Sequence, residues 1–309
     1  MQRVGGDDIV GEALRGGIVA LGNFDGFHLG HQAVVGRAVE LARAQGRPAI
    51  VATFDPHPVR YFKPDVAPFR LTVLDQRERL FSHAGADAML VFRFNQELAG
   101  VSAEAFVTER LISRLGAAGV VTGEDYIFGK GRRGSVEMLA DLGRMHGLSV
   151  ETVGPVSADG QPVSSSRIRA ALKDGDCVTA TRLMTRPYAI QGAVQHGDKV
   201  GRTIGFPTAN VGMADYMRPR YGIYAVRARL SDGRMLDGAA NLGIRPTFDP
   251  PKELLEPYLF DFSGDLYGQV IEIELHGFIR AEAKFDSLGA LTAQMNRDCA
   301  SAKALLRSL

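Results

Sequence analysis

The sequence has 309 residues, of which 45% are hydrophobic and 23% are charged, and its formal net charge is +1. A chain of this length exceeds what one hydrophobic core usually serves, so we expect two domains. The near-neutral charge provides no strong field toward nucleic acid or an anionic membrane, and we expect neither as a partner. The two cysteines, Cys177 and Cys299, argue against a disulfide framework and a cysteine zinc site.

The N-terminal residues contain no apolar run typical of a secretory signal, and no segment approaches the length of a membrane span. We therefore expect a cytoplasmic protein. The sequence does not predict an oligomeric state.

The first 184 residues alternate between strand-like and helix-like segments. Short apolar runs predict the strands, and helical spacing or capping residues predict the helices. The expected strands are residues 17–21, 48–54, 87–92, 119–123 and 148–153. The expected helices are residues 31–45, 75–84, a segment that begins at Ser102, 135–146 and 164–173. This alternation predicts a parallel α/β sheet that is covered on both faces.

After Pro187 the pattern changes to strands separated by Gly, Pro and Asp turns. The expected strands are residues 188–194, 222–230, 234–242, 258–262 and 269–275, and a long helix is expected at about 286–307. This order predicts an antiparallel barrel with a terminal helix. We therefore expect domains of residues 1–184 and 185–309.

The stretch GNFDGFHLGH, residues 22–31, follows the first expected strand. Ligands of open α/β sheets bind at the carboxyl ends of the strands, and Gly22 and Gly26 allow a tight turn there. A helix that begins near His28 directs free amides at an anion, and His28 and His31 share one face of it. The stretch predicts a phosphate site. A zinc site is the alternative, but no third ligand is spaced nearby.

This pattern resembles the HxGH motif of the nucleotidyltransferase superfamily, which binds ATP phosphates and stabilises charge on them. In the form GNFDGxHxGH it is similar to the adenylyltransferase half of bacterial bifunctional riboflavin kinase/FMN adenylyltransferases. TFDPHP (53–58), GEDYIFGKGRRG (123–134) and SSSRIR (164–169) carry the same resemblance. A proline-rich turn explains the prolines of TFDPHP, but it leaves Asp55 and His57 unexplained.

The resemblance implies catalytic roles for His28, His31 and Arg167. It implies nucleotide or flavin binding by Gly22, Asn23, Phe24, Asp25, Gly30, Asp125, Ser164, Ser165, Ser166 and Arg169. Serines at a helix start with arginines reaching out also suit a polyphosphate. The alternative for SSSRIR is an ordinary capped helix with exposed arginines.

HGDKVGRTIGFPTAN, residues 196–210, is a glycine-rich loop that leads into an extended segment. It lacks the GxxxxGKS pattern of a P-loop, and its glycines alone would also suit a long hairpin turn. Thr208 and Asn210 are two residues apart, so their oxygens face one side and suit Mg²⁺ carried by a nucleotide. The nucleotide-binding residues expected here are Gly201, Arg202, Gly205, Thr208 and Asn210.

GFPTAN is typical of riboflavin kinases, and YGIYAV, AANLGIRPTF and LLEPYLFDFSGDLYG resemble their neighbouring stretches. The resemblance implies that Thr208 and Asn210 hold the Mg-nucleotide and that Glu256 takes the proton of the riboflavin 5′-hydroxyl. Pro257 predicts that Glu256 stands at the entrance of a strand. A surface glutamate is the alternative. Arg297 and Asp298 match a polar pair that, in such kinases, lies near the flavin on the terminal helix.

Taken over residues 15–306, the resemblance implies an α/β Rossmann-like nucleotidyltransferase domain followed by an all-β six-stranded antiparallel barrel with a C-terminal helix. It implies phosphorylation of riboflavin to FMN with Mg²⁺ and ATP, then adenylylation of FMN to FAD with release of pyrophosphate. The expected partners are riboflavin, FMN and ATP. The alternatives are adenylylation of another phosphate monoester, an inactive first domain, a flavin or nucleotide sensor, and an RNA-binding protein, which the charge pattern disfavours.

Overall fold

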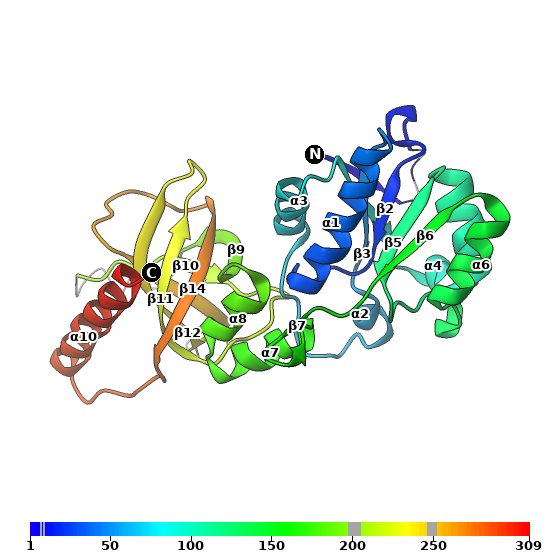
Figure 1. Ribbon diagram of the computed structural model, residues 1–309. Coiled ribbons are helices and arrows are strands. Elements are labelled where there is room, and N and C mark those ends of the chain that lie inside the picture. Colours follow the sequence, from blue (N-terminus) through cyan, green and yellow to red (C-terminus); the bar gives the residue numbers. More distant parts are fainter. Residues whose placement is uncertain (7, 9, 197–204, 246–251) are drawn as a thin grey trace. The chain divides into compact units, whose positions relative to one another are not determined.

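The computed structural model describes the chain except residues 7, 9, 197–204 and 246–251. The chain divides into two compact units (Figure 1). The first unit is Met1–Val66 with Leu74–Ser164, and the second is Ala67–Val73 with Ser165–Leu309. The domain boundary expected at residue 184 stays a prediction. Among the described residues, no helix combines the length and the apolar composition needed to cross a bilayer.

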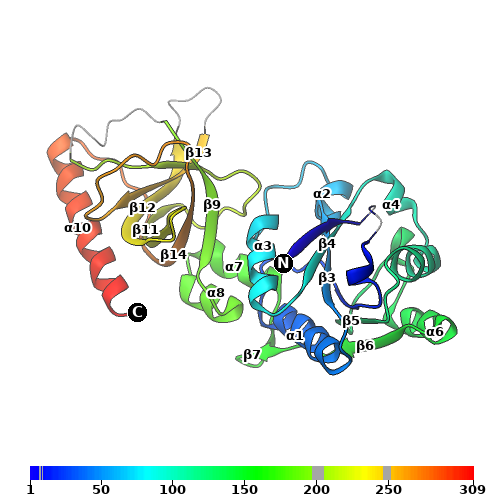
Figure 2. The same ribbon diagram turned by 90° about the horizontal axis from the view of Figure 1, so that it is seen from above.

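The first unit is built on a six-stranded sheet in the order β1-β4-β3-β2-β5-β6 (Figures 1 and 2). Every pairing in it is parallel, which confirms the expected α/β sheet. The strands are β1 (Gln2–Gly5), β2 (Ile18–Leu21), β3 (Ala49–Asp55), β4 (Ala88–Arg93), β5 (Gly119–Gly123) and β6 (Ser149–Val153), beside a hairpin of β7 (Ser157–Ala158) and β8 (Gln161–Pro162). The edge strand β1 was not predicted, because its four residues show no apolar run.

Helices cover both faces of this sheet. They are η1 (Glu12–Leu14), α1 (Leu29–Ala44), α2 (Pro58–Phe62), α3 (Leu74–His83), α4 (Gln96–Gly100), α5 (Ala103–Ala105), the π-helix η2 (Phe106–Arg114), η3 (Lys130–Arg132) and α6 (Val136–His146). Ile18 and Ala20 of β2 pack with residues of α1 and α3, whereas Val19 and Leu21 pack with residues of η2 and α6. Because both faces are buried, β2 is apolar throughout.

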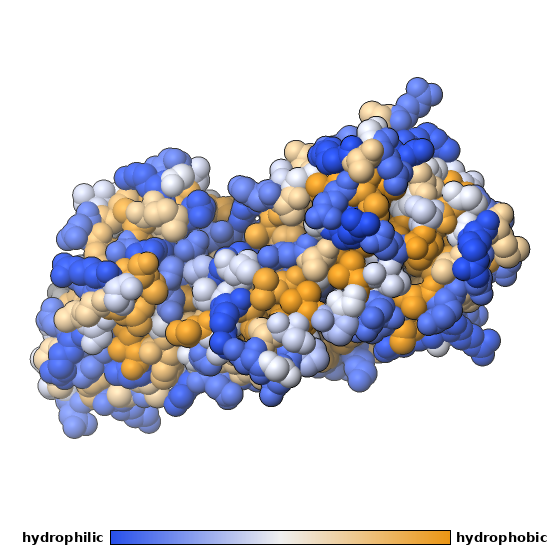
Figure 3. All heavy atoms as spheres, in the orientation of Figure 1, coloured by the Kyte–Doolittle hydropathy of each residue, from blue (hydrophilic) through white to orange (hydrophobic). Residues whose placement is uncertain are grey.

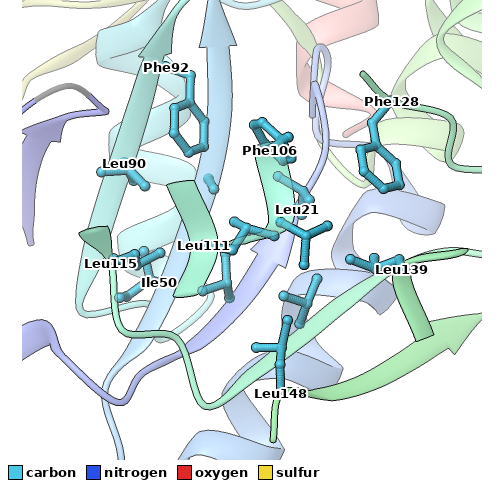
Figure 4. Packing of buried hydrophobic residues seen from close by; sticks show 14 of the residues in the cluster. Leu21, Ile50, Leu90, Phe92, Phe106, Leu111, Leu115, Phe128, Leu139 and Leu148 are labelled. Carbon is cyan, nitrogen blue, oxygen red and sulfur yellow. The ribbon is translucent and has the colours of Figure 1, made fainter. Parts of the chain in front are cut away.

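Aromatic rings fill the core on the η2 and α6 side (Figure 4). Phe106 of η2 lies between Phe92 and Phe128, with ring centroids 5.4 and 5.8 Å away. Below them, Leu21 of β2 packs with Leu111 of the same helix. This packing joins the sheet to η2 and α6.

The second unit is a closed antiparallel barrel of six strands in the order β10-β13-β12-β11-β14-β9. The strands are β9 (Tyr188–Gln195), β10 (Asn210–Gly212), β11 (Gly222–Arg229), β12 (Met235–Arg245), β13 (Lys252–Leu259) and β14 (Val270–Arg280). The helices are α7 (Ser165–Asp174), α8 (Cys177–Met184) and α10 (Leu288–Arg307). α10 runs beside the barrel (Figure 2). Its Ala302 and Leu306 pack on Phe260. The expected barrel with a terminal helix is confirmed.

Strand β13 corrects one expectation from the sequence. We expected a strand at residues 258–262 with Glu256 at its entrance, but β13 runs over Lys252–Leu259 and Glu256 lies within it. The carbonyl of Pro257 accepts a hydrogen bond from the Ala209 amide at 3.0 Å. In an antiparallel pair both backbone groups of a residue face the same partner, so the nitrogen of Pro257, which carries no hydrogen, also faces Ala209. Because β10 begins only at Asn210, the proline interrupts no formed ladder there.

The face drawn in Figure 3 mixes hydrophilic and hydrophobic residues over both units. No single hydrophobic patch dominates that face.

Candidate functional site

The loop that follows β2 has an unusual backbone. Phe24, Gly26 and Phe27 have φ values of 50°, 86° and 39°. Positive φ is uncommon for residues other than glycine and costs about 1–3 kcal/mol each. The rings of Phe24 and Phe27 are buried against Phe81 of α3, with centroids 5.8 and 5.1 Å away. Aromatic packing therefore holds a strained turn after Gly22, at the carboxyl end of a parallel strand.

His28 and His31 form a stacked pair at the start of α1, with ring centroids 3.6 Å apart and an interplanar angle of 18°. His28 caps the helix, and its Nδ1 accepts a hydrogen bond from the His31 amide at 3.4 Å. With Nδ1 as the acceptor, the proton of a neutral imidazole lies on Nε2, which becomes a donor. A Cβ at Gly30 would lie only 3.2 Å from His28 Cε1, so glycine leaves room for the imidazole. The structure brings these three motif residues together.

A buried arginine lies beneath this loop. Arg77 of α3 donates from Nη1 to the Thr53 hydroxyl at 2.9 Å and to the Asn23 carbonyl at 3.2 Å. The Thr53 hydroxyl also donates to the Asn23 carbonyl at 2.9 Å. Arg77 Nη2 lies 3.6 Å from Asp55 Oδ1. Sequence reasoning missed Arg77 and Thr53, because a charged helix predicts a solvated arginine and an apolar strand predicts a packed threonine.

Two neighbouring features account for TFDPHP. Asp55 ends β3 and faces the buried Arg77. His57 caps α2, where its Nδ1 accepts a hydrogen bond from the Val59 amide at 3.1 Å. The two residues that the sequence left unexplained thus have local structural partners.

An aromatic group is exposed near the ends of β3 and β4. Tyr61 and Phe62 of α2 lie edge-on to Phe94, with centroids 5.4 and 5.7 Å away. Phe62 is 64% exposed. A large exposed ring beside other rings is a suitable surface for a flat aromatic ligand.

Three other predicted residues of the first unit, Asn23, Asp25 and Asp125, lie in loops. Asn23 has a buried side-chain oxygen without a hydrogen-bond partner among the described residues. Asp125 is exposed in the turn after β5, where the Tyr126 amide donates to the Gly123 carbonyl at 3.1 Å. Asp25 is buried.

The SSSRIR motif spans the division between the units: Ser164 ends the first, and Ser165, Ser166, Arg167 and Arg169 lie on α7 of the second. Arg169 Nε donates to the Phe69 carbonyl at 2.7 Å, and its guanidinium lies 5.2 Å from the Phe69 ring centre. Phe69 belongs to the segment Ala67–Val73, which packs within the second unit. Arg169 therefore ties α7 to that segment.

Three polar residues form a row across adjacent barrel strands. Asn241 of β12 lies opposite Glu256 of β13. The register of β10 on β13, extended by one residue, places Asn210 opposite Glu256 from the other side. Paired residues point to the same face of a sheet, so the three side chains share one face. Asn241 Nδ2 donates to Glu282 at 3.3 Å, and its Oδ1 is buried with no partner in the described part of the chain.

The second unit also contains a pocket of about 360 Å³. It is lined by Val194, Pro207, Thr208, Ala209, Pro257, Leu259, Phe262, Ser263, Gly264, Asp265, Leu266 and Tyr267. Tyr267 also stacks on His196 with centroids 3.8 Å apart. Sequence reasoning identified Thr208 but not the apolar and aromatic lining, which only the closed barrel assembles. Gly201 and Arg202 lie outside the described residues, and Gly205 follows them at φ 83°.

Glu253 is the other carboxylate of β13, and alternation places it on the opposite face from Glu256. Arg218 Nε donates to it at 2.7 Å, and the Tyr221 hydroxyl donates to its other oxygen. Partial burial raises the pKa of Glu253, but these hydrogen bonds outweigh the burial and hold the pKa below its usual value. Burial and the neighbouring carboxylate raise the pKa of Tyr221 to about 12. Glu253 is therefore a poorer proton acceptor than an ordinary glutamate.

The predicted polar pair on α10 separates into two roles. Arg297 is exposed and donates to Gln294 of the same helix at 3.0 and 2.6 Å. Asp298 is buried and accepts two hydrogen bonds from Arg280 of β14. Asp298 thus fixes the helix to the barrel.

Comparisons with known proteins cover both units. A family model described as FAD synthetase matches residues 11–167, and one described as riboflavin kinase matches residues 184–306. The "Bifunctional riboflavin kinase/FMN adenylyltransferase" of Haemophilus influenzae is 38% identical over 308 residues, which cover 100% of both chains. Proteins of the same description from Pseudomonas fluorescens and Bacillus subtilis are 40% and 39% identical, over 94% and 91% of this chain and 93% and 90% of their own.

A solved structure is similar over nearly the whole chain. It is described as "Crystal Structure of Macrolide-efflux Protein from Streptococcus pneumoniae". The TM-score is 0.85 at 30% sequence identity, and the match covers 96% of this chain and 97% of that one. The similarity supports the sheet, the barrel and the terminal helix as one known fold combination.

Proposed function

This chain belongs to the bifunctional riboflavin kinase/FMN adenylyltransferase family, and we propose how its residues divide the two reactions of that family. The enzyme makes FMN from riboflavin and FAD from FMN. One observation supports the assignment of one reaction to each unit. The stacked histidines lie at the end of the parallel sheet, and the Asn210–Glu256–Asn241 row lies on the barrel. Each reaction thus has its own set of polar groups.

The barrel phosphorylates riboflavin. Glu256 accepts the proton of the 5′-hydroxyl as that oxygen attacks the γ-phosphorus of ATP, and ADP leaves with the electrons of the broken bond. The pocket beside Thr208 receives the nucleotide, with Tyr267 and Phe262 offering aromatic surface to the base. Glu253 does not replace Glu256, because it is engaged with Arg218 on the other face.

The donor set near the pocket fits a magnesium ion that arrives with the nucleotide. Thr208 and Asn210 offer neutral hard oxygens, and the described residues include no cluster of three His, Cys, Asp or Glu that could hold a metal alone. Mg²⁺ commonly takes one or two protein ligands and completes its shell with phosphates and water. Bound there, it would neutralise charge on the phosphates.

The parallel-sheet part transfers AMP to FMN. A phosphate oxygen of FMN attacks the α-phosphorus of ATP, the bond to the bridging oxygen breaks, and pyrophosphate leaves. The attacking oxygen is already anionic, so no protein base is needed. His28 donates from Nε2 to the phosphate oxygens, and His31 offers a second imidazole donor as negative charge develops. The free amides at the start of α1 act in the same direction. The catalytic role of Arg167 rests on the resemblance of SSSRIR to the family motif.

The exposed aromatic group gives FMN a surface in this part of the chain. Phe62 and Tyr61 lie near the carboxyl ends of β3 and β4, where ligands of such sheets bind. Stacking of the isoalloxazine ring on Phe62 would bury a side chain that is otherwise 64% exposed. This aromatic contact would hold the flavin while its phosphate reacts.

Separate substitutions test the division. With riboflavin, ATP and Mg²⁺, His28→Ala should accumulate FMN and lose FAD formation by about 10²–10³-fold. Glu256→Gln should lose FMN formation by about 10²–10⁴-fold and still convert supplied FMN into FAD. Both products are separated by chromatography over time. His146→Ala, an exposed histidine at the end of α6, and Glu253→Gln are the matched controls. Loss of both activities from either folded variant would refute the division.

A further inference from the structure

Arg77 is a buried cation that none of the roles above uses. Its side chain is 4% exposed, and its Nη2 lies 3.6 Å from the carboxylate of Asp55, which is 29% exposed. Burying a guanidinium is costly unless it is paired and hydrogen-bonded. Its remaining described contacts go to the Thr53 hydroxyl and the Asn23 carbonyl. Arg77 is thus bound to the backbone of the proposed ATP loop itself.

These contacts fix one peptide of that loop. The Asn23 carbonyl accepts from Thr53 at 2.9 Å and from Arg77 at 3.2 Å. In a planar trans peptide the carbonyl and the following N–H point in opposite directions. The Phe24 amide therefore points away from Thr53 and Arg77, and within the described part of the chain it has no hydrogen-bond acceptor.

The turn needs this support because Phe24 has a φ of 50°. Without the two donors, the Asn23–Phe24 peptide could rotate and relieve the strain. Rotation would swing the amide N–H away from its present direction. Packing of the Phe24 ring on Phe81 holds the side chain, but it does not by itself fix the orientation of the preceding carbonyl.

We propose that Arg77 is a positioning residue for adenylyl transfer, which holds the Asn23–Phe24 peptide so that the Phe24 amide donates to a nucleotide phosphate. This inference rests on the proposed role of residues 22–31 in binding ATP. Arg77 does not touch the substrate.

A second buried arginine provides the matched control. Arg110 of η2 is also 4% exposed and is paired with Glu97 of α4 at 2.6 Å. Arg77→Met and Arg110→Met each remove one buried guanidinium from the same unit. If Arg77 serves stability alone, both variants should change the enzyme in the same way.

The experiment compares wild type, Arg77→Met, Arg77→Lys and Arg110→Met in both reactions. Arg77→Met should raise the KM for ATP in FAD formation by about 10- to 100-fold, while riboflavin phosphorylation by the same polypeptide stays within about twofold. Arg77→Lys should recover part of the loss, because an ammonium group can still donate to the Asn23 carbonyl. Arg110→Met should leave the KM for ATP unchanged.

Thr53→Val keeps the test decisive if Arg77→Met does not fold. Thr53 is fully buried, and valine preserves its shape while removing the hydroxyl. It should raise the same KM, and its effect should not add to that of Arg77→Lys, because both act on one carbonyl. An unchanged KM for ATP in folded Arg77→Met or Thr53→Val, or an equal rise in Arg110→Met, overturns the inference. If the wild type formed no FAD, the proposed function itself would fail first.

Discussion

The ion pair between Arg280 and Asp298 attaches helix α10 to the barrel, and its loss has a predictable cost. Arg280 donates to the two carboxylate oxygens at 2.8 and 2.6 Å, and Gln294 donates to the same carboxylate at 2.8 Å. The side chains of Asp298 and Arg280 are 6% and 23% exposed. Asp298→Asn keeps the size of the side chain but leaves the guanidinium without its counter-ion.

Removing one partner of a buried ion pair costs about 3–5 kcal/mol. Arg280 is partly exposed, so water recovers some of this loss, and we expect about 2–3 kcal/mol. The second unit has about 150 residues, for which each kcal/mol lowers Tm by about 2–4 °C. The barrel transition should therefore fall by about 4–12 °C.

Differential scanning calorimetry of the full chain measures this shift. Asp237→Asn is the control, because the Arg227–Asp237 pair of 3.0 Å lies in the same barrel with side chains 31% and 46% exposed. An exposed pair contributes about 1 kcal/mol or less, so its Tm should fall by at most about 4 °C. If Asp298→Asn were no less stable than Asp237→Asn, the pair would not anchor the helix.

Two further predictions concern stability. Asp176 caps α8 by accepting from the Thr179 amide at 2.9 Å, and hydrogen bonds from the Thr179 side chain and amide lower the pKa of Asp176. Because the pKa of Asp176 is lower in the folded state, its carboxylate stabilises the fold above the unfolded pKa, and this stabilisation is lost as the pH falls through the folded pKa. Asp176→Asn should therefore flatten the pH dependence of the free energy of urea unfolding between about pH 5 and pH 2. Equal pH dependence in the variant and the wild type would contradict this. A Cβ at Gly222 would lie 2.2 Å from the Arg280 carbonyl oxygen at φ 148°, so Gly222→Ala should cost about 3 kcal/mol or more in urea unfolding. Gly233→Ala, strained at φ 88° but in open space, should cost only about 1 kcal/mol, and equal losses would refute the steric argument.

Local patterns in the sequence predicted most of the parallel sheet and its helices. The apolar run at residues 17–21 became β2, and Ser102 caps the next helix by accepting from the Ala105 amide at 3.0 Å. The proximity of His28 and His31 followed from helical spacing alone. These features depend on residues a few positions apart, which periodicity and capping rules describe.

Features that depend on distant residues were not predicted. Arg77 lies in the charged segment DQRERL, and nothing local distinguishes it from Arg79, yet its partners are 54 and 24 positions away. The position of Glu256 within β13 was missed because Pro257 argues against a strand unless its missing N–H faces an unformed part of the ladder. Asn241 acquires its place beside Glu256 only through the register of β12 on β13.

The segment Ala67–Val73 has a consequence for synthesis on the ribosome. It is translated between β3 and α3, but the Arg70 amide donates to the Asp215 carbonyl at 3.1 Å, and the Met217 amide donates to the Arg70 carbonyl at 2.8 Å. At about 5–20 residues per second, these partners are made roughly 7–30 s later. The remaining strands of the parallel sheet, β4, β5 and β6, are synthesised in that interval, so the sheet can form around a loop whose own contacts are still untranslated. Slow codons or a chaperone acting after residue 153 would therefore affect the docking of this segment rather than the sheet.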